Sequence, residues 1–159
     1  MGKTYIIRKT QSINTDISKV FAVWTDIEKW HLWTKSVNSI TFIGNKKFEI
    51  GSRVKAFQPK LPPAVWTITE VRNNELFVWQ TKTFGVTIVA KHKLRTALYG
   101  TISESELIYS GLFACILRRL SKNLVFEYLT MEMDGLKKEC EKQRQPEIQT
   151  TNNPNKFNE

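Results

Sequence analysis

Apolar residues recur at helical spacing over the last long segment of the chain, from about Leu112 to Cys140. One stripe consists of Phe113, Leu117, Leu120, Leu124, Tyr128 and Met131, and beside it lie Ile116, Val125, Leu129, Leu136 and Cys140. Spacings of three and four residues place such side chains on one face of an α-helix. The pattern therefore predicts one long amphipathic helix with a broad apolar face.

The part of the chain before this helix consists mostly of short runs rich in β-branched and aromatic residues, which indicate strands. Seven strands are predicted, over Tyr5–Ile13, Ser36–Ile43, Gly51–Gln58, Val65–Val71, Leu76–Lys82, Val86–Leu94 and Leu98–Ile108. The turns between them are short, as at Gly44–Asn45, so neighbouring strands should pair antiparallel in sequence order.

Two short helices are expected after the first strand. Asn14 or Thr15 can cap the first of them, whose apolar residues, such as Val20 and Trp24, recur at helical spacing. Thr25 followed by Glu28 forms a capping-box signature, which predicts that a second helix starts at residue 26.

The length of the chain, 159 residues, fits one domain with a substantial core. We expect a single domain over residues 1–142, followed by a flexible polar tail over residues 143–159. The proline-rich segment Gln58–Pro63 predicts an extended loop at the rim of the sheet.

This order of elements predicts an α+β fold, in which a curved antiparallel sheet of about seven strands wraps around the long C-terminal helix. A bent sheet and a straight helix cannot touch along their whole lengths. The two layers can therefore enclose an apolar cavity between them.

Several motifs carry a resemblance to a known family. They are Trp24–Trp30 with Trp33, the segment Gly51–Val54, the segment Gln58–Trp66, the pair Val78–Trp79, the pair Gly85–Val86, His92, and Leu136–Lys137. Over roughly residues 3 to 142 the chain resembles the START-like superfamily, and within it the polyketide cyclase/dehydrase-like branch of bacterial SRPBCC proteins. The resemblance implies the helix-grip fold and a hydrophobic cavity between the sheet and the last helix. It implies no family-wide catalytic residues, because the superfamily includes lipid carriers, hormone receptors, cyclases and chaperone activators.

Alternation along the sixth strand places Ile88 and His92 on the inner face of the sheet and the lysines Lys91 and Lys93 on the outer face. The same reasoning gives the candidate ligand-binding residues Trp33, Trp66, Ile68, Phe77, Trp79, Ile88, His92, Leu117, Leu120, Leu124 and Tyr128. The aromatic members of this set also fit a plain hydrophobic core.

Three residues are candidates for acid or base chemistry. His92 is the histidine on the inner face, where it fits a hydrogen-bonded core residue, a polar anchor or a general acid/base. Glu104 and Glu106 face inward if Ile102 does, and are solvated if Ser103 faces inward instead. The pattern leaves this register open.

The chain carries a formal net charge of +9, with a pI of about 9.6. Its basic residues are scattered without a dense tract, so nucleic-acid binding is disfavoured and transient contact with an anionic membrane remains open. The sequence leaves the oligomeric state open.

The glycine, histidine and cysteine patterns contain no phosphate-binding loop and no zinc-site spacing, so we expect no metal and no cofactor. A continuous final helix would hold Cys115 and Cys140 roughly 37 Å apart, too far for a disulfide. Reduced thiols, the lack of a membrane-spanning stretch and the lack of a signal-peptide core predict a cytoplasmic protein.

Two functions fit these features. The first is the binding or carriage of a small hydrophobic molecule, such as a lipid, a polyketide-like compound or an aromatic, held by apolar contact and one or two polar anchors. The alternative is a cyclase, dehydratase or isomerase in which His92, with Glu104 or Glu106, moves protons.

Overall fold

A computed structural model describes residues 4–142, and within them one seven-stranded sheet packs against one long helix. The elements in chain order are β1 (Tyr5–Ile13), α1 (Ile17–Thr25), the 3-10 helix η1 (Ile27–Leu32), β2 (Ser39–Ile43), β3 (Arg53–Phe57), β4 (Ala64–Arg72), β5 (Leu76–Thr83), β6 (Val86–Ala97), β7 (Gly100–Gly111) and α2 (Ala114–Glu141). This arrangement confirms the predicted α+β helix-grip fold. The expected flexible tail over residues 143–159 lies outside the described residues.

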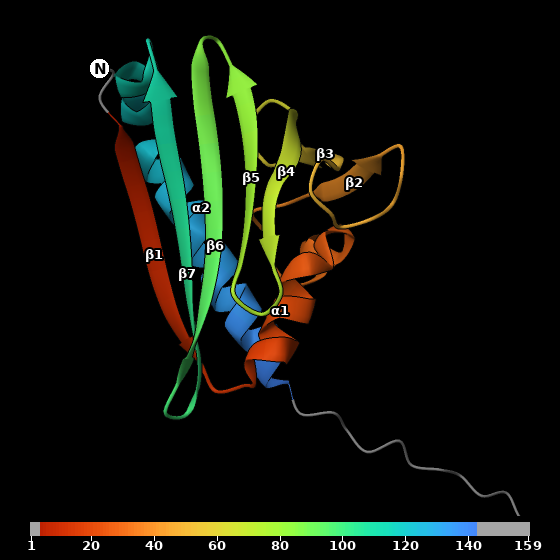
Figure 1. The fold of residues 1–159 in the computed structure, drawn as a ribbon. Helices are drawn as coiled ribbons and strands as arrows, with labels where there is room; N and C mark the ends of the chain where they lie inside the picture. Colours follow the sequence, from red (N-terminus) through yellow and green to blue (C-terminus); the bar gives the residue numbers. More distant parts are fainter. Residues whose placement is uncertain (1–3, 143–159) are drawn as a thin grey trace, which may run out of the picture.

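The sheet has the order β1-β7-β6-β5-β4-β3-β2, and all of its strand pairs are antiparallel (Figure 1). Strands β2 to β7 are neighbours in sequence order, as short turns require, and β1 completes the sheet beside β7. The long strands β1, β7, β6 and β5 form one wall, whereas β2 and β3 lie across its far side (Figure 1).

Several strand bounds differ from the predicted ones by one to three residues, and the structure explains two of these differences. β2 begins at Ser39 instead of Ser36, because the Ser36 hydroxyl is buried and bonded to side chains outside the sheet. β7 begins at Gly100 instead of Leu98, because Leu98 and Tyr99 form the exposed turn that joins it to β6.

The caps of the two short helices also differ from prediction. Asp16 caps α1 by accepting the Ser18 amide at 2.8 Å, while the Thr15 hydroxyl donates to the Cys140 carbonyl. The expected capping box at Thr25 does not form, because Thr25 is the last residue of α1 and its hydroxyl donates to the Phe21 carbonyl at 2.9 Å. The second helix is consequently a short 3-10 helix with no side-chain cap.

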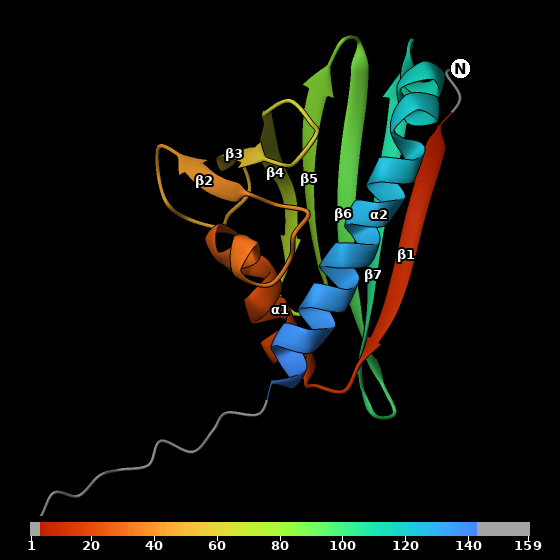
Figure 2. The same ribbon diagram turned by 180° about the vertical axis from the view of Figure 1, so that it is seen from behind.

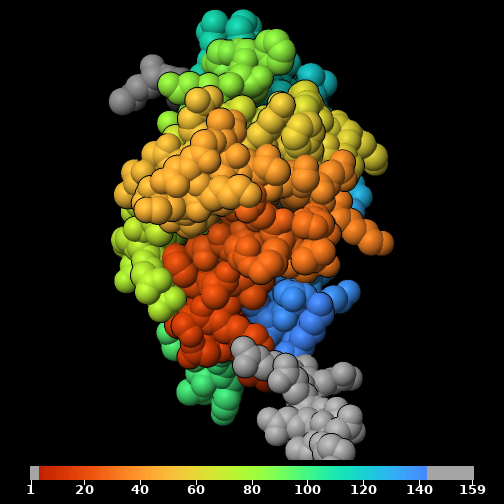
Figure 3. Space-filling view, turned by 90° about the vertical axis from the view of Figure 1, so that its right-hand side faces the viewer, coloured from red at the N-terminus to blue at the C-terminus, as the bar shows by residue number. Residues whose placement is uncertain are grey.

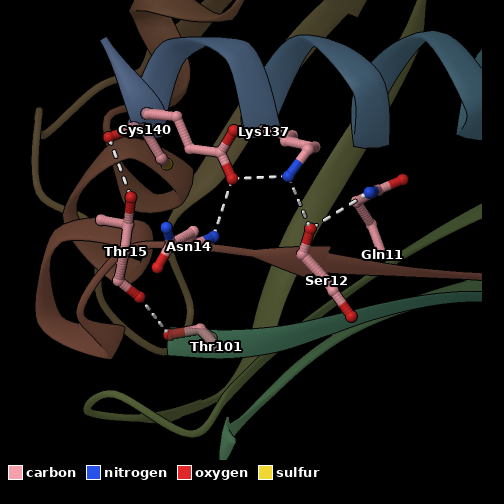
Figure 4. Close-up of polar contacts among 8 residues, drawn as sticks. Gln11, Ser12, Asn14, Thr15, Thr101, Lys137 and Cys140 are labelled. Atoms are coloured by element: carbon pink, nitrogen blue, oxygen red, sulfur yellow. Dashed lines mark hydrogen bonds and ion pairs between the residues drawn. The ribbon is translucent and has the colours of Figure 1, made fainter. Parts of the chain in front are cut away.

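The helix α2 crosses the inner face of the sheet diagonally, with its first half beside β1 and its last turns beside α1 (Figure 2). A set of polar contacts fixes its C-terminal end (Figure 4). The Lys137 ammonium donates to the Ser12 carbonyl at 3.1 Å and pairs with Glu141, which in turn accepts the Asn14 amide at 2.7 Å. Within residues 4–142 no helix is long and apolar enough to cross a membrane.

A glycine on α2 allows the closest approach of this helix to the rest of the fold. A Cβ atom on Gly135 would lie 2.2 Å from the carbonyl oxygen of Trp33. The C-terminal half of α2 is therefore pressed onto the segment after η1, and Met133 and Leu136 become fully buried there.

Candidate functional site

A cavity of about 440 Å³ lies between the inner face of the sheet and α2. Its volume falls within the roughly 300–1,000 Å³ that small-molecule sites occupy. Most of its wall is apolar. The sheet contributes Ile40, Ala56, Trp66, Trp79, Ile88, Ala90, Leu107 and Tyr109, and α2 contributes Leu117, Val125, Tyr128 and Leu129.

Two apolar clusters hold α2 against the rest of the fold. One apolar cluster joins the last turns of α2 to α1, η1 and the middle strands, and includes Met133 and Leu136. The other joins the first and middle turns of α2 to β1, β6 and β7, and includes Val125 and Leu129. The space between these two clusters is left unfilled, in agreement with the expected geometry of a straight helix on a bent sheet.

The mouth of the cavity lies between the loop after β3 and the β5–β6 hairpin. Pro62, Pro63, Lys82 and Phe84 line it and are exposed to solvent. The hydroxyl of Tyr128 donates to the Pro59 carbonyl and so ties this loop to α2. In Figure 3 the loop appears in yellow, just below the hairpin and the start of α2 at the top of the molecule.

His92 lines the inner part of the cavity from the middle of β6. Its ring stacks on Phe77, with 4.3 Å between the ring centroids, and meets the edge of Trp24 at 4.2 Å. The Nδ1 atom is hydrogen-bonded to the Ser105 hydroxyl at 3.0 Å, and Nε2 has no hydrogen-bond partner among residues 4–142. Burial lowers the pKa of His92 to about 3, so the ring is neutral at physiological pH.

Glu132 lines the same cavity from α2, one helical turn after Tyr128. Its Oε1 accepts a hydrogen bond from the Ser36 hydroxyl at 3.0 Å, and Ser36 is bonded to the Thr34 hydroxyl at 2.9 Å. Burial raises the pKa of Glu132 to about 7, although the bond from Ser36 acts in the opposite direction. The carboxyl is therefore close to half protonated at neutral pH.

Sequence reasoning did not identify Glu132 as a site residue. The sequence does place this residue on the apolar face of the helix, because it follows Tyr128 at a spacing of four residues. Its neighbours on that face are Leu129, Met133 and Leu136. An acid within such an apolar face needs a buried partner, which here is Ser36.

The structure brings together about half of the candidate ligand-binding residues. Those that line the cavity are Trp66, Trp79, Ile88, His92, Leu117 and Tyr128. Ile68 and Phe77 are fully buried in the core behind it, and Trp33 packs against Trp30, with 5.3 Å between the ring centroids. Leu124 is half-buried outside the lining, and Leu120 is 80% exposed on the outer side of α2.

Glu104 and Glu106 lie on the outer face of the sheet, because the inward positions of β7 are held by Ser103 and Ser105. Both glutamates pair with Arg8 and Lys93, which are also on the outer face. Burial acts to raise the pKa of Glu106, but the contacts with Arg8 and Lys93 outweigh it and lower that pKa. Neither glutamate can exchange a proton with a molecule in the cavity.

The family described as "Polyketide cyclase / dehydrase and lipid transport" matches residues 5–141. No curated protein matches the chain. Among solved structures, the hypothetical protein jhp0584 from Helicobacter pylori is similar, with a TM-score of 0.71, 13% identity, and coverage of 87% of this chain and 88% of that one.

Two further proteins of known structure are similar as well. Norcoclaurine synthase from Thalictrum flavum, in complex with dopamine and hydroxybenzaldehyde, has a TM-score of 0.66 and 15% identity, with 87% of each chain covered. The di-domain ARO/CYC StfQ from the steffimycin biosynthetic pathway has a TM-score of 0.68 and 8% identity over 87% of this chain. The present chain spans about half (51%) of the length of StfQ. At these identities the likeness shows a shared fold.

Proposed function

The chain belongs to the polyketide cyclase/dehydrase and lipid transport family of the START-like superfamily, and from this premise we propose that it binds a small lipophilic molecule in the cavity under α2. The fold is compatible with ligand binding or with cyclase activity. One observation carries the proposal: a mostly apolar cavity of about 440 Å³ has the buried polar groups His92 and Glu132 in its wall.

The walls suit an aromatic or polycyclic ligand. Trp66, Trp79 and Tyr128 offer ring faces and edges on two sides of the cavity, where flat apolar molecules gain contact area. Norcoclaurine synthase, which shares the fold, is known in complex with dopamine and hydroxybenzaldehyde. A ring system of comparable size fits the volume of this cavity.

The polar groups favour a ligand with a hydroxyl or carbonyl group over one with a carboxylate. Glu132 can form a hydrogen bond with such a group whether or not it is protonated. The Nε2 atom of neutral His92 is buried without a partner among residues 4–142, and a ligand group that reached it would form a second bond. A ligand carboxylate would have to share this dry cavity with the Glu132 carboxyl, which costs binding energy because like charges repel strongly there.

An enzyme is the second candidate, and Glu132 is the observation in its favour. A carboxyl whose pKa is about 7 is suited to general acid/base catalysis, whereas His92, with a pKa of about 3, is a weak base. In a cyclase or dehydratase of this architecture, Glu132 would transfer the proton. His92 would hold a substrate oxygen by a hydrogen bond.

We place this binding in the cytoplasm on the basis of the thiols. Cys115 and Cys140 are both free, the former exposed and the latter buried. Burial raises the pKa of Cys140 to about 12, so this thiol is unreactive. Loading of the cavity from an anionic membrane, suggested by the net charge, is part of the same proposal.

The binding proposal is tested by titrating 2-naphthol into the protein and following the quenching of tryptophan fluorescence. Ala90→Leu places a larger side chain in the cavity and should weaken binding by about tenfold or more. Ala97→Leu, at the end of the same strand and outside the cavity, is the matched control and should bind as the wild type does. Absence of saturable binding, or equal affinities in the two variants, would contradict the proposal.

Native mass spectrometry of the purified protein separates a carrier from an enzyme. A carrier should hold the same co-purifying molecule in the wild type and in Glu132→Gln. A dehydratase that relies on Glu132 should retain unreacted substrate in Glu132→Gln, heavier by the mass of one water than the product held by the wild type. A cyclase that closes a ring without losing water gives a product of equal mass, so the molecules released from the two proteins should then differ in chromatographic retention.

A further inference from the structure

Five large apolar side chains are exposed together at one end of the molecule. They are Phe84, Leu112, Phe113, Ile116 and Leu120, and we refer to them as the apolar tip. Phe84 is 86% exposed, Leu112 84% and Leu120 80%. Clusters of exposed apolar side chains on a folded protein generally mark a surface of interaction.

The apolar tip is built from two segments that are distant in sequence. Phe84 occupies the turn of the β5–β6 hairpin, and the other four side chains come from the start of α2 and the residues just before it. These segments lie side by side at the upper end in Figures 1, 2 and 3. A Cβ atom on Gly85 would lie 3.5 Å from the Phe113 ring, which places the hairpin directly against the start of α2.

The residues nearest the apolar tip carry positive charge, and the first acidic residue of α2, Glu127, comes about two helical turns after Leu120. The basic residues in the segments at this end are Lys60, Lys82, Arg118, Arg119 and Lys122. The segments 58–64, 82–86 and 109–126 contain no aspartate or glutamate. The basic residues appear scattered in the sequence, but the fold gathers these five at the same end as the exposed apolar side chains.

The mouth of the cavity opens at this end. Phe84 and Lys82 line the mouth, and Leu117 lines the cavity between the outward-facing Ile116 and Leu120. Any surface that covered the apolar tip would therefore lie next to the opening through which a ligand enters.

We propose that the apolar tip docks onto the surface of an anionic lipid membrane, with its apolar side chains inserted among the lipids and its lysines and arginines on the phosphates. Apolar residues flanked by basic ones are the combination that holds peripheral proteins on such membranes. A second copy of the chain fits this surface poorly, because two such surfaces would bring their positive charges together. The inference deepens the proposed function and rests on it, since docking at the mouth would let a lipophilic ligand pass between bilayer and cavity.

Co-sedimentation with vesicles tests the proposal. The wild type should bind vesicles of phosphatidylcholine mixed with phosphatidylserine, and should bind vesicles of phosphatidylcholine alone much more weakly. Added salt should weaken the binding, because it screens the contacts with phosphate. The double variant Ile116→Gln/Leu120→Gln should lose binding by about tenfold or more, and Arg119→Gln/Lys122→Gln should lose most of the preference for phosphatidylserine.

The matched control is Leu98→Gln/Tyr99→Gln, because these two apolar residues are equally exposed in the β6–β7 turn at the opposite end. This variant should bind the mixed vesicles as the wild type does. Equal binding by the control and the tip variants would overturn the proposal. The proposal would also be overturned if the wild type did not bind vesicles and instead sedimented as a dimer, with Ile116→Gln/Leu120→Gln sedimenting as a monomer.

The same variants keep this inference separable from the proposed function. Ile116 and Leu120 lie outside the cavity lining, so Ile116→Gln/Leu120→Gln should still bind 2-naphthol with wild-type affinity, which also shows that it is folded. If vesicle binding fails while 2-naphthol binds, the docking inference alone is wrong. If vesicles bind and 2-naphthol does not, the cavity proposal is wrong.

Discussion

His92 and Glu132 show how one environment moves two pKa values in opposite directions. Burial raises the pKa of Glu132 to about 7 and lowers that of His92 to about 3, because the dry cavity disfavours the charged form of each group. A wall with a neutral imidazole and a half-protonated carboxyl is suited to neutral ligands. The pH dependence of stability should reveal both shifts.

Glu132→Gln should stabilise the protein above neutral pH. Between pH 4.5 and 7 the folded wild type retains a proton that the unfolded chain has released, so its unfolding free energy falls as pH rises, by about 3 kcal/mol in total. Glutamine stays neutral and still accepts the bond from Ser36. Urea unfolding measures the difference in unfolding free energy between the variant and the wild type, and this difference should be larger at pH 8 than at pH 4.5 by about the same amount. If the unfolding free energies of the two proteins change equally with pH, Glu132 titrates as an exposed glutamate does.

His92→Gln should reduce the acid sensitivity of the fold. Below pH 6.5 the His92 side chain is protonated in the unfolded wild-type chain but stays neutral in the folded protein. The unfolding free energy therefore falls by about 1.4 kcal/mol per pH unit as the pH drops toward about 3. Loss of the ring stacking on Phe77 lowers the stability of the variant at every pH. The difference in unfolding free energy between wild type and variant should therefore narrow on acidification. A constant difference would contradict the pKa assigned to His92.

At the residue scale, sequence reasoning worked best where alternation was strict. It placed Ile88 and His92 on the inner face of β6 because consecutive strand residues must face opposite ways. It could not place Glu104 and Glu106, since a shift of one residue exchanges the two faces. Leu120 was misplaced because α2 has two apolar stripes, and helical spacing does not say which of them faces the sheet.

At the scale of elements, the two halves of α2 differ in how they contact the rest of the fold. Its C-terminal half is fixed by the polar contacts of Lys137 and Glu141 (Figure 4). The close approach of Gly135 to Trp33 fixes it further. Its N-terminal half carries several exposed apolar residues and borders the mouth of the cavity. The fixed end sets the position of Glu132, only three residues before Gly135.

Gly135→Ala should destabilise the fold although alanine is the better helix former. Helix propensity alone would favour alanine by about 1 kcal/mol. The new methyl group would clash with the Trp33 carbonyl, and the required backbone shift should outweigh that gain and give a net loss of about 2 kcal/mol. Denaturant unfolding measures the loss, with the exposed Asp134→Ala as control. A stabilised Gly135→Ala would mean that α2 does not approach Trp33 so closely.

The elements themselves were predictable because long periodic segments have few competing structures. All seven strands, both short helices and α2 were expected within a few residues of their observed bounds. The start of β2 was predicted wrongly because a side chain there forms a hydrogen bond with a residue distant in sequence. The Ser36 hydroxyl bonds to Glu132, far along the chain, and this shortens β2 at its start in a way that local sequence cannot reveal.

At the scale of the whole molecule, the closed end and the open end have different roles. The closed end joins α2 to α1 and β1, and the open end gathers the mouth, the apolar tip and its basic residues. The sequence suggested a cavity through the order of its elements. It could not show that the basic residues gather around the mouth, because they come from loops and helices far apart in the chain.

A ligand that fills the cavity should stabilise the whole fold. Binding to the folded state alone raises the unfolding free energy, by about 2.7 kcal/mol when the free ligand is at a hundred times its dissociation constant. Thermal unfolding with 2-naphthol should therefore show a higher Tm for the wild type and for Ala97→Leu. The Tm of Ala90→Leu should hardly change, and an equal rise in all three proteins would indicate binding elsewhere.

The central claim is that the space between the sheet and α2 is open to a guest. A crystal structure of the protein with 2-naphthol tests it most directly. The account predicts electron density for the ring system between Trp66, Trp79 and Tyr128, with its hydroxyl within hydrogen-bond distance of His92 or Glu132. Side chains that fill this space, with 2-naphthol absent or bound only on the outside, would contradict it.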